Sequence, residues 1–333
     1  MKKICFFANH ILTKNHYKTS DYYTNDIKIF KELGYEVVIC ESAKQIPDDV
    51  DLYFIWWWSS GIIALRHAKK FKKPTIMIGN LHYTDPSTQG YFARPFYIRT
   101  MIKYCLRNSD LQIATSKIEF EGIKTLKAKN PIYLYHCIDE TKYSHNRLDR
   151  QNYLFTVTHL TEVNVERKKV KEIIKAFNLL KDEFPDLKLK IAGGTDDKGY
   201  LGVKQIVDNL NINDRVEFLG RIPDSEKIEH YKNCKIYVQP TDFEGFGMAI
   251  AESMLCGAPV VTSPNGAVPE VTGDLAVMVD ANNIDEIATG IRKLMNDEGL
   301  YKKLNSEGPK RIKELFSYNV RKEKIKQILE KFI

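Results

Sequence analysis

Short apolar runs alternate with longer amphipathic segments from one end of the chain to the other. The runs are three to seven residues long and rich in Ile, Val, Leu and aromatic residues. Such runs are typical of strands that are buried on both faces. The expected strands are residues 3–8, 36–40, 52–58, 74–79, 111–115 and 132–136 in the first half, and 153–159, 187–192, 216–219, 235–239, 259–261 and 276–279 in the second.

The segments between these runs have apolar residues every three to four positions, the period of a helix with one buried face. Strands that alternate with helices predict a parallel α/β sheet. The alternation occurs twice, on either side of the polar stretch 146–152, which we expect to be a linker between two domains. The expected helices are residues 22–33, 61–70, 95–108, 117–127, 170–180, 200–210, 247–255 and 284–295, with further helices from about 301 to 332.

Composition agrees with two cores of ordinary size, because 43% of the 333 residues are hydrophobic. The six cysteines have no CxxC spacing, which favours buried free thiols in a reducing compartment. The chain begins Met1-Lys2-Lys3 and continues into an apolar run too short for a signal peptide. The longest run, 52–58, is too short to span a membrane. We therefore expect a cytoplasmic protein.

Positive charge is concentrated in the first half. Residues 1–150 hold 23 Lys and Arg against 15 Asp and Glu, a net charge of +8, whereas residues 151–333 have a net charge of −1. This asymmetry suggests an anionic partner such as a membrane surface or a phosphate-bearing acceptor. Nucleic acid is not predicted, because no binding motif supports it.

Within this half, residues 91–108 interleave aromatic residues with four cations four to five positions apart. A helix of this kind could rest on anionic lipid as a peripheral membrane contact. The alternative is an ordinary amphipathic helix with a solvated basic face. Both interpretations are open from the sequence alone.

The stretch 239–261 carries the most specific candidate chemistry. Glu244 and Glu252 bracket seven residues, and Gly245 and Gly247 precede an expected helix that follows a strand directly. In a parallel sheet, ligands lie beyond the carboxyl ends of the strands, where helix N-termini favour anions such as phosphate. Two carboxylates beside such a site could accept hydrogen bonds from sugar hydroxyls. The alternative is that Glu244 is a loop charge and Glu252 a solvated helix residue.

The segment EGFGMAIAESMLCGAPVVTS resembles the signature of the retaining, nucleotide-sugar-dependent glycosyltransferases of family 4. The resemblance implies the GT-B fold, in which two Rossmann-like domains face an interdomain cleft. Residues 1–146 would form the acceptor domain and residues 153–315 the donor domain. Residues 316–333 would form a last helix that crosses back to the first domain.

The same resemblance implies roles for residues of the donor domain. Glu244 would orient the donor sugar, and Glu252 would accept hydrogen bonds from the ribose. Lys168 matches the family lysine that neutralises the donor diphosphate. Because His159 occupies the usual place of the family arginine, Arg167 is expected to supply the second cation from a longer loop. The other residues implied to contact the donor are Gly245, Phe246, Gly247, Met248, Gly193, Gly220 and Arg221.

In the first half, His82 follows the fourth expected strand and matches the family histidine that contacts the reacting sugar. The chain departs from the family elsewhere. The loop after the first strand lacks the usual Gly-Gly pair, and Lys14 or Lys18 could contribute charge there. His136 and Cys137 replace the family's Asn-Gly where the chain leaves the first domain.

Taken together, the sequence predicts transfer of a sugar from a nucleotide diphosphate to a hydroxyl of a glycan or lipid-linked acceptor, as in polysaccharide biosynthesis. The resemblance implies retention at the anomeric carbon, assistance by the leaving phosphate, and neither a metal nor a cofactor. Two alternatives stay open. One is a GT-B epimerase or phosphorylase, and the other is a non-catalytic subunit that binds a sugar nucleotide.

Overall fold

The computed structural model describes residues 1–9, 20–143, 149–195 and 198–333. The chain forms two compact units, one made of Met1–Cys137 with Phe316–Ile333 and the other of Ile138–Leu315. The last segment of the chain therefore belongs to the same unit as the first. The first strand of the second unit begins at Gln151, within the polar stretch expected as a linker. Lys14 and Lys18 lie outside the described residues.

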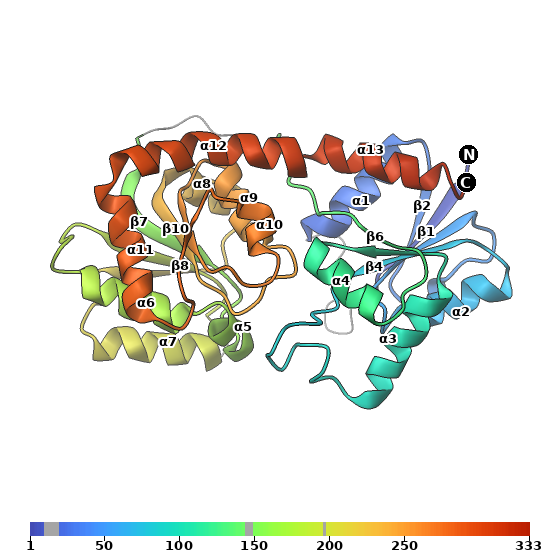
Figure 1. Cartoon of the computed structure of the whole chain (residues 1–333), viewed down its shortest axis with the longest axis horizontal. Helices are drawn as coiled ribbons and strands as arrows, with labels where there is room; N and C mark the ends of the chain where they lie inside the picture. The colour runs from blue at the N-terminus through green and yellow to red at the C-terminus, as the bar shows by residue number, and fades with distance from the viewer. Residues whose placement is uncertain (10–19, 144–148, 196–197) are drawn as a thin grey trace. The chain divides into compact units, whose positions relative to one another are not determined.

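The first unit contains a parallel sheet with the strand order β2-β1-β3-β4-β5-β6 (Figure 1). Its strands are β1 (Lys3–Phe7), β2 (Glu36–Cys40), β3 (Leu52–Trp56), β4 (Thr75–Gly79), β5 (Leu111–Ala114) and β6 (Pro131–Tyr133). Its helices are α1 (Asp21–Glu32), the short 3-10 helix η2 (Ala43–Gln45), α2 (Ile62–Lys70), α3 (Phe96–Asn108), α4 (Lys117–Thr125) and α13 (Tyr318–Leu329).

Both faces of this sheet are apolar, as the continuous apolar runs predict. In β1, Cys5 and Phe7 belong to one cluster of buried side chains, and Ile4 and Phe6 belong to another. The second cluster also contains side chains of α13, so the end of the chain completes this core. A buried ion pair joins α13 to α1, with Arg321 Nε 2.7 Å from Asp26 Oδ1.

The second unit contains a parallel sheet with the order β12-β11-β10-β7-β8-β9. Its strands are β7 (Gln151–Val157), β8 (Lys188–Ala192), β9 (Val216–Gly220), β10 (Cys234–Gln239), β11 (Val260–Thr262) and β12 (Val277–Met278). The helices are α5 (Glu162–Arg167), α6 (Val170–Leu180), α7 (Lys198–Asn209), α8 (Asp224–Asn233), α9 (Met248–Leu255), α10 (Val268–Thr272), α11 (Ile284–Asn296) and α12 (Glu298–Phe316).

Each sheet has one point where the direction of strand addition reverses. In the second unit β7 lies between β8 and β10, so the reversal falls between β7 and β10. In the first unit it falls between β1 and β3. Open α/β sheets bind their ligands outside the carboxyl ends of the strands at this switch point. The loops that follow β7 and β10 are therefore the first place to look for a site.

Three expected elements differ from the structure. Strand β3 ends at Trp56 because Trp57 adopts a left-handed backbone with a φ of 71°. Strand β6 ends at Tyr133, and the next two carbonyl groups accept hydrogen bonds from the guanidinium of Arg321. The region expected as a loop before residue 170 contains α5. The signal for this helix is Thr161, whose side chain accepts a hydrogen bond from the backbone of Asn164.

All six cysteines are buried and free, as their spacing predicts.

None of the helices in the described part of the chain combines the length and apolar character that crossing a membrane requires.

Candidate functional site

The candidate site lies where β7 and β10 end side by side. These strands are parallel neighbours, with Leu154 opposite Ile236 and Phe155 opposite Tyr237. The connections that follow them therefore emerge at the same edge of the sheet. The connection after β7 runs through α5 to Lys168, and the connection after β10 contains Glu244. The topology thus brings together two residues that are 76 positions apart in the chain.

Glu244 and Lys168 form the central contact of this site. The ammonium group of Lys168 donates to Glu244 Oε1 at 2.7 Å. The same carboxylate oxygen accepts a hydrogen bond from Gln239 Nε2 at 3.1 Å and lies 3.6 Å from Arg167 Nη1. The hydroxyl of Tyr237 donates in turn to Gln239 Oε1 at 2.5 Å. A continuous polar chain therefore runs from the interior of the sheet to the carboxylate.

Arg167 also joins the two connections to each other. Its Nη1 donates to the carbonyl oxygen of Phe243 at 3.0 Å, and its Nη2 donates to Asn164 Oδ1 at 3.1 Å. Its own carbonyl oxygen accepts from the backbone N–H of Asp242 at 2.8 Å. The guanidinium is therefore held beside Glu244 by backbone and side-chain contacts.

A third connection, after β11, fixes the backbone of Glu244. The carbonyl oxygen of Glu244 accepts from the N–H of Ala267 at 2.8 Å. Gly266 has a φ of +66°, and a Cβ atom there would lie 2.3 Å from the same carbonyl oxygen. Only glycine fits this position without displacing the backbone.

Burial controls the electrostatics of Lys168. The side chains of Lys168 and Arg167 are each 14% exposed, and that of Glu244 is 11% exposed. Burial lowers the pKa of Lys168 below its ordinary value of 10.5, and the nearby charge of Glu244 only partly opposes this shift. The charge of Arg167 lowers the same pKa further. An additional anion at this site would restore the proton affinity of the amine.

Glu252 has a separate set of partners on α8. Its Oε2 accepts from the hydroxyl of Tyr231 at 3.0 Å and lies 3.3 Å from Lys227 Nζ. Lys227 also pairs with Asp224 at 3.2 Å. Burial alone would lower the pKa of Lys227, but the charges of Glu252 and Asp224 outweigh it and raise that pKa. Glu252 is thus a nearly buried carboxylate that is held by two donors, not a solvated helix residue.

Helix α9 begins immediately after the loop that holds Glu244. Gly247 adopts a left-handed conformation with a φ of +96°, which ends the loop and starts the helix. Phe246 is buried beneath this turn, whereas Met248 is partly exposed. The positive end of the helix dipole therefore lies next to the Glu244 loop.

Local contacts explain why glycines stand at the carboxyl ends of β8 and β9. A Cβ atom on Gly193 would lie 2.1 Å from the carbonyl oxygen of Thr158, so the connection after β7 occupies the space that its missing side chain leaves. Gly193 donates its N–H to the carbonyl oxygen of Gly220 at 2.8 Å, and Gly220 has a φ of +68°. Arg221 is exposed. Their contact with a nucleotide stays a prediction.

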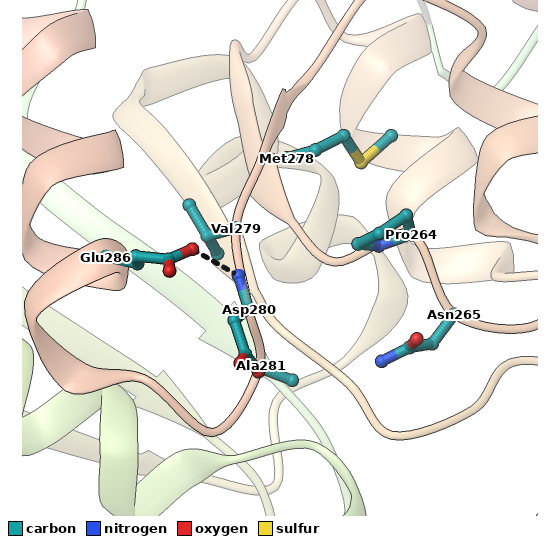
Figure 2. A pocket seen from close by; sticks show the side chains of 7 residues that line it. All are labelled: Pro264, Asn265, Met278, Val279, Asp280, Ala281 and Glu286. Carbon is teal, nitrogen blue, oxygen red and sulfur yellow. Dashed lines mark hydrogen bonds between the residues drawn. The ribbon is translucent and has the colours of Figure 1, made fainter.

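A pocket of about 380 Å³ lies beyond the carboxyl ends of β11 and β12. Figure 2 shows Pro264 and Asn265 on one side of it and Val279 to Ala281 on the other. Glu286 of α11 accepts a hydrogen bond from the backbone of Asp280 at 2.9 Å at its rim. Asn265 directly precedes Gly266, so one connection both lines this pocket and supports Glu244. None of the predicted site residues lines the pocket.

His82 belongs to the first unit and follows β4. Its backbone is left-handed, with a φ of 56°, and its N–H donates to both carboxylate oxygens of the buried Glu119 at 3.0 Å. Its ring atom Nδ1 lies 3.3 Å from Asp85 Oδ2. Burial alone would raise the pKa of Asp85, but hydrogen bonds from His82 and Ser87 outweigh it and lower that pKa. Two carboxylates therefore orient this histidine, and the sequence analysis identified neither.

Among the described residues, no three His, Cys, Asp or Glu side chains are grouped so that they could hold a metal ion together.

Comparison with known families decides what kind of protein carries this arrangement. The family described as glycosyl transferases group 1 matches residues 138–311, which is more than half of the chain and includes Lys168, Glu244 and Glu252. The chain belongs to this family. It is therefore a glycosyltransferase that depends on a nucleotide-sugar donor, as the resemblance in the sequence predicts.

Two similar proteins extend the match beyond this region. N-acetyl-alpha-D-glucosaminyl L-malate synthase of Bacillus anthracis is 24% identical over 305 residues, which cover 88% of this glycosyltransferase and 78% of that protein. An uncharacterised glycosyltransferase of Methanocaldococcus jannaschii is 26% identical over 329 residues, which cover 96% of this chain and 88% of that one.

Solved structures confirm the predicted GT-B fold of this glycosyltransferase. Sucrose-phosphate synthase from Thermosynechococcus elongatus has a TM-score of 0.82 at 17% identity and covers 99% of both chains. The Anabaena protein HepE in complex with UDP and glucose has a TM-score of 0.80 at 15% identity and covers 99% of this chain and 100% of that one. At these identities the likeness concerns the fold alone.

The structure brings Lys168, Arg167 and Glu244 of this glycosyltransferase into direct contact, and it places Glu252 on the helix that follows. The sequence analysis missed their supporting residues. Gln239 is a polar residue at the end of an apolar strand, and Lys227 and Tyr231 are four positions apart on α8. A polar residue at a strand end and an i, i+4 polar pair were the available signals.

Proposed function

We propose that this glycosyltransferase moves a hexosyl group from a nucleotide diphosphate to a hydroxyl, with retention at the anomeric carbon and without a metal ion. The observation that carries the proposal is the 2.7 Å contact between Lys168 and Glu244 at the switch point of the second sheet. A cation and a carboxylate in one place match the two parts of such a donor, an anionic diphosphate and a hydroxylated sugar.

Lys168 would stabilise the charge that develops on the departing diphosphate. Burial lowers the pKa of Lys168, and Glu244 opposes this shift only in part. A diphosphate would place further negative charge beside the ammonium and stabilise its protonated form. Arg167 and the start of α9 would add positive potential at the same edge. These groups are already held by their neighbours, which is the arrangement that electrostatic stabilisation requires.

Donor binding would change the partner of Glu244. In the structure, the carboxylate accepts hydrogen bonds from Lys168 and Gln239. When phosphate oxygens approach Lys168, the carboxylate would turn to accept hydrogen bonds from hydroxyls of the donor sugar. Glu252, held by Tyr231 and Lys227, would accept from the ribose.

The predicted contacts at the periphery of the donor complete this proposal. Gly245, Phe246, Gly247 and Met248 would lie along the sugar and phosphates, and Gly193, Gly220 and Arg221 along the nucleoside. His82 would contact the reacting sugar through the imidazole that Asp85 orients.

The chemical step would exchange one C–O bond for another. The bond from the anomeric carbon to the phosphate oxygen breaks, and its electron pair remains on the diphosphate. The acceptor oxygen bonds to the same carbon from the same face and gives its proton to the departing phosphate oxygen. Retention therefore needs no covalent enzyme intermediate. Enclosure from water would limit hydrolysis of the donor.

The acceptor in this proposal is a hydroxyl of a glycan or of a lipid-linked molecule. Residues 91–108 would keep the protein at the cytoplasmic surface of a membrane, where a lipid-linked acceptor is available. The support for this part is the basic and aromatic composition of that segment.

Titration of the purified protein with UDP-, GDP- and ADP-sugars tests the donor first. UDP-glucose is the starting point because the similar fold of HepE holds UDP and glucose. Saturable binding of one donor, with release of nucleoside diphosphate on addition of acceptor, is the expected result. NMR of the product would show an anomeric configuration equal to that of the donor. Donor binding without any turnover across acceptors would favour a non-catalytic subunit, and isomerised or phosphorolysed donor would favour the other alternative.

A further inference from the structure

Helices α2 and α3 of the first unit expose a surface that the transfer reaction does not use. The two helices pack against each other (Figure 1). We define this surface, the basic–aromatic face, by its exposed cations and its exposed apolar side chains. The cations are Arg66, Lys69, Lys70, Lys103 and Arg107, and the apolar side chains are Ile63, Phe92, Phe96 and Tyr97.

The charge of this region is almost entirely of one sign. Residues 52–109 contain nine Lys and Arg and a single acidic residue, Asp85. Asp85 is buried and pairs with His82, so it does not offset the surface charge. Within the described part of the chain, no carboxylate lies within ion-pair distance of the cations that define the face. Nearby acids have other partners, since Asp48 pairs with His67 and Asp110 with Lys129.

The exposed aromatic residues are not accounted for by the core. Phe96 is 74% exposed, Phe92 59% and Tyr97 56%. The core side of α3 is formed by Ile102, Cys105 and Leu106. Phe96, Lys103 and Arg107 are spaced so that they share the opposite side of the helix. Aromatic residues thus stand at the beginning of this side, and cations continue along it.

The face begins at the edge of the sheet where His82 lies. Tyr83 directly follows His82, and its ring centroid is 5.0 Å from that of Phe92 and 5.6 Å from that of Tyr91. Phe92, one of the exposed aromatic residues, is therefore connected by ring contacts to the carboxyl end of β4. An extended partner bound to this face would reach the edge of the first sheet that carries the predicted sugar-contacting histidine.

We propose that the basic–aromatic face docks on a bilayer that contains anionic lipids. Phe92, Phe96 and Tyr97 enter the interfacial region, where their rings bury apolar area and the hydroxyl of Tyr97 stays hydrated. The cations of α2 and α3 contact the headgroups, which explains why they have no carboxylate partners. This membrane contact rests on the proposed function, in which the acceptor is lipid-linked. The protein should bind bilayers with acidic headgroups in preference to neutral ones.

The test is sedimentation of the whole protein with vesicles. One set is phosphatidylcholine alone, and the other is phosphatidylcholine and phosphatidylglycerol in equal parts. We expect at least about tenfold tighter binding to the acidic vesicles, because each basic residue near such a surface strengthens binding several-fold. Raising the salt concentration should reduce this preference.

Two sets of substitutions separate the charges from the rings. Reversal of two charges in K103E/R107E should weaken binding to acidic vesicles by more than about tenfold. The triple variant F92S/F96S/Y97S should weaken vesicle binding, and the binding that remains should be more sensitive to salt. The matched controls lie in the second unit, where K310E/K313E reverses two exposed lysines and L179S/L201S removes two exposed leucines. Both controls should bind as the unaltered protein does.

Three outcomes would overturn the proposal. The first is equal binding to both kinds of vesicle, or to neither. The second is an equal loss of vesicle binding in K310E/K313E, which would mean that net charge alone explains the binding. The third is a dimer in sedimentation velocity that F92S/F96S/Y97S abolishes, which would make the face a contact between copies of the chain. Donor hydrolysis, measured in parallel without vesicles, should be unchanged in all these variants, so failure here leaves the proposed reaction untouched.

Discussion

The cations of the two units are used in opposite ways. In the second unit, Lys168 and Arg167 are nearly enclosed and lie against Glu244. In the first unit, the cations of the basic–aromatic face are exposed and have no carboxylate within ion-pair distance among the described residues. An enclosed cation with a fixed partner suits one small anion in one orientation, whereas an exposed row suits an extended anionic surface. The same residue types thus support two kinds of recognition, and the difference lies in burial.

Loss of the contact between Lys168 and Glu244 should have the greatest consequence. Glu244→Ala should lower the rate of sugar transfer by about a hundredfold or more, because it removes a fixed contact of the reacting donor. Steady-state kinetics with the identified donor measure this loss, and circular dichroism checks that the variant is folded. Vesicle binding should not change. An unaltered transfer rate would remove Glu244 from the site.

A smaller effect should come from the glycine that supports Glu244. Gly266→Ala places a methyl group against the backbone of Glu244 at a positive φ, so we expect about a tenfold slower transfer and a loss of about 1–3 kcal/mol in the free energy of unfolding. Urea denaturation and the transfer assay measure the two quantities.

The matched control is Gly202→Ala in α7, where no atom lies within 4 Å of the added Cβ atom. This change should increase stability by about 0.5–1 kcal/mol and leave transfer unchanged. Equal behaviour of the two variants would show that the close approach at Gly266 has no consequence for the site.

The enclosed lysine also predicts a dependence on pH. Because burial lowers the pKa of Lys168, its ammonium loses the proton at a lower pH than the ordinary 10.5. As the pH rises through this lowered pKa, kcat/KM for the donor should fall, since the neutral amine does not attract the diphosphate. Lys168→Arg should shift this fall to higher pH, because a guanidinium stays protonated. A profile that is identical in the two proteins would assign the titration to another group.

Charge reversal on the basic–aromatic face should change the chemistry least. K103E/R107E changes the net charge of the first unit but touches no residue of the Glu244 site, so donor hydrolysis at physiological salt should stay within about twofold. Hydrolysis of the donor in the absence of membranes measures it. A large change would mean that the exposed cations act on the donor directly.

The sequence was sufficient for most of the elements and for locating the stretch that carries Glu244 and Glu252, because both depend on local patterns. Buried strands appear as apolar runs, and Glu244, Gly247 and Glu252 lie within a single stretch of strand, loop and helix. That Lys168 serves the same donor as Glu244 was implied only by the family resemblance, since the pair is far apart in the chain, and their direct contact was not predicted. Helix α5 was missed because the polar run that contains Lys168 has too few apolar positions to show a helical period.

The supporting contacts could not be predicted from the sequence. The sequence did not show that the missing side chain of Gly193 admits the carbonyl of Thr158, and the contact of Gly193 with the donor stays a prediction. Asp85 contacts the ring of His82, and Glu119 of α4 accepts from its backbone N–H. Glu119 reaches His82 only because α4 lies against the segment that follows β4. Such contacts depend on distances between elements, which periodicity does not contain.

One feature of the first unit affects how the protein is made. Its core is closed by α13, whose Arg321 fills a buried position opposite Asp26. During synthesis, the ribosome produces residues 1–137 long before it produces these closing side chains, so this unit must wait in an incomplete state while the second unit emerges and folds. The order of translation is therefore the reverse of the order in which the two units can finish folding.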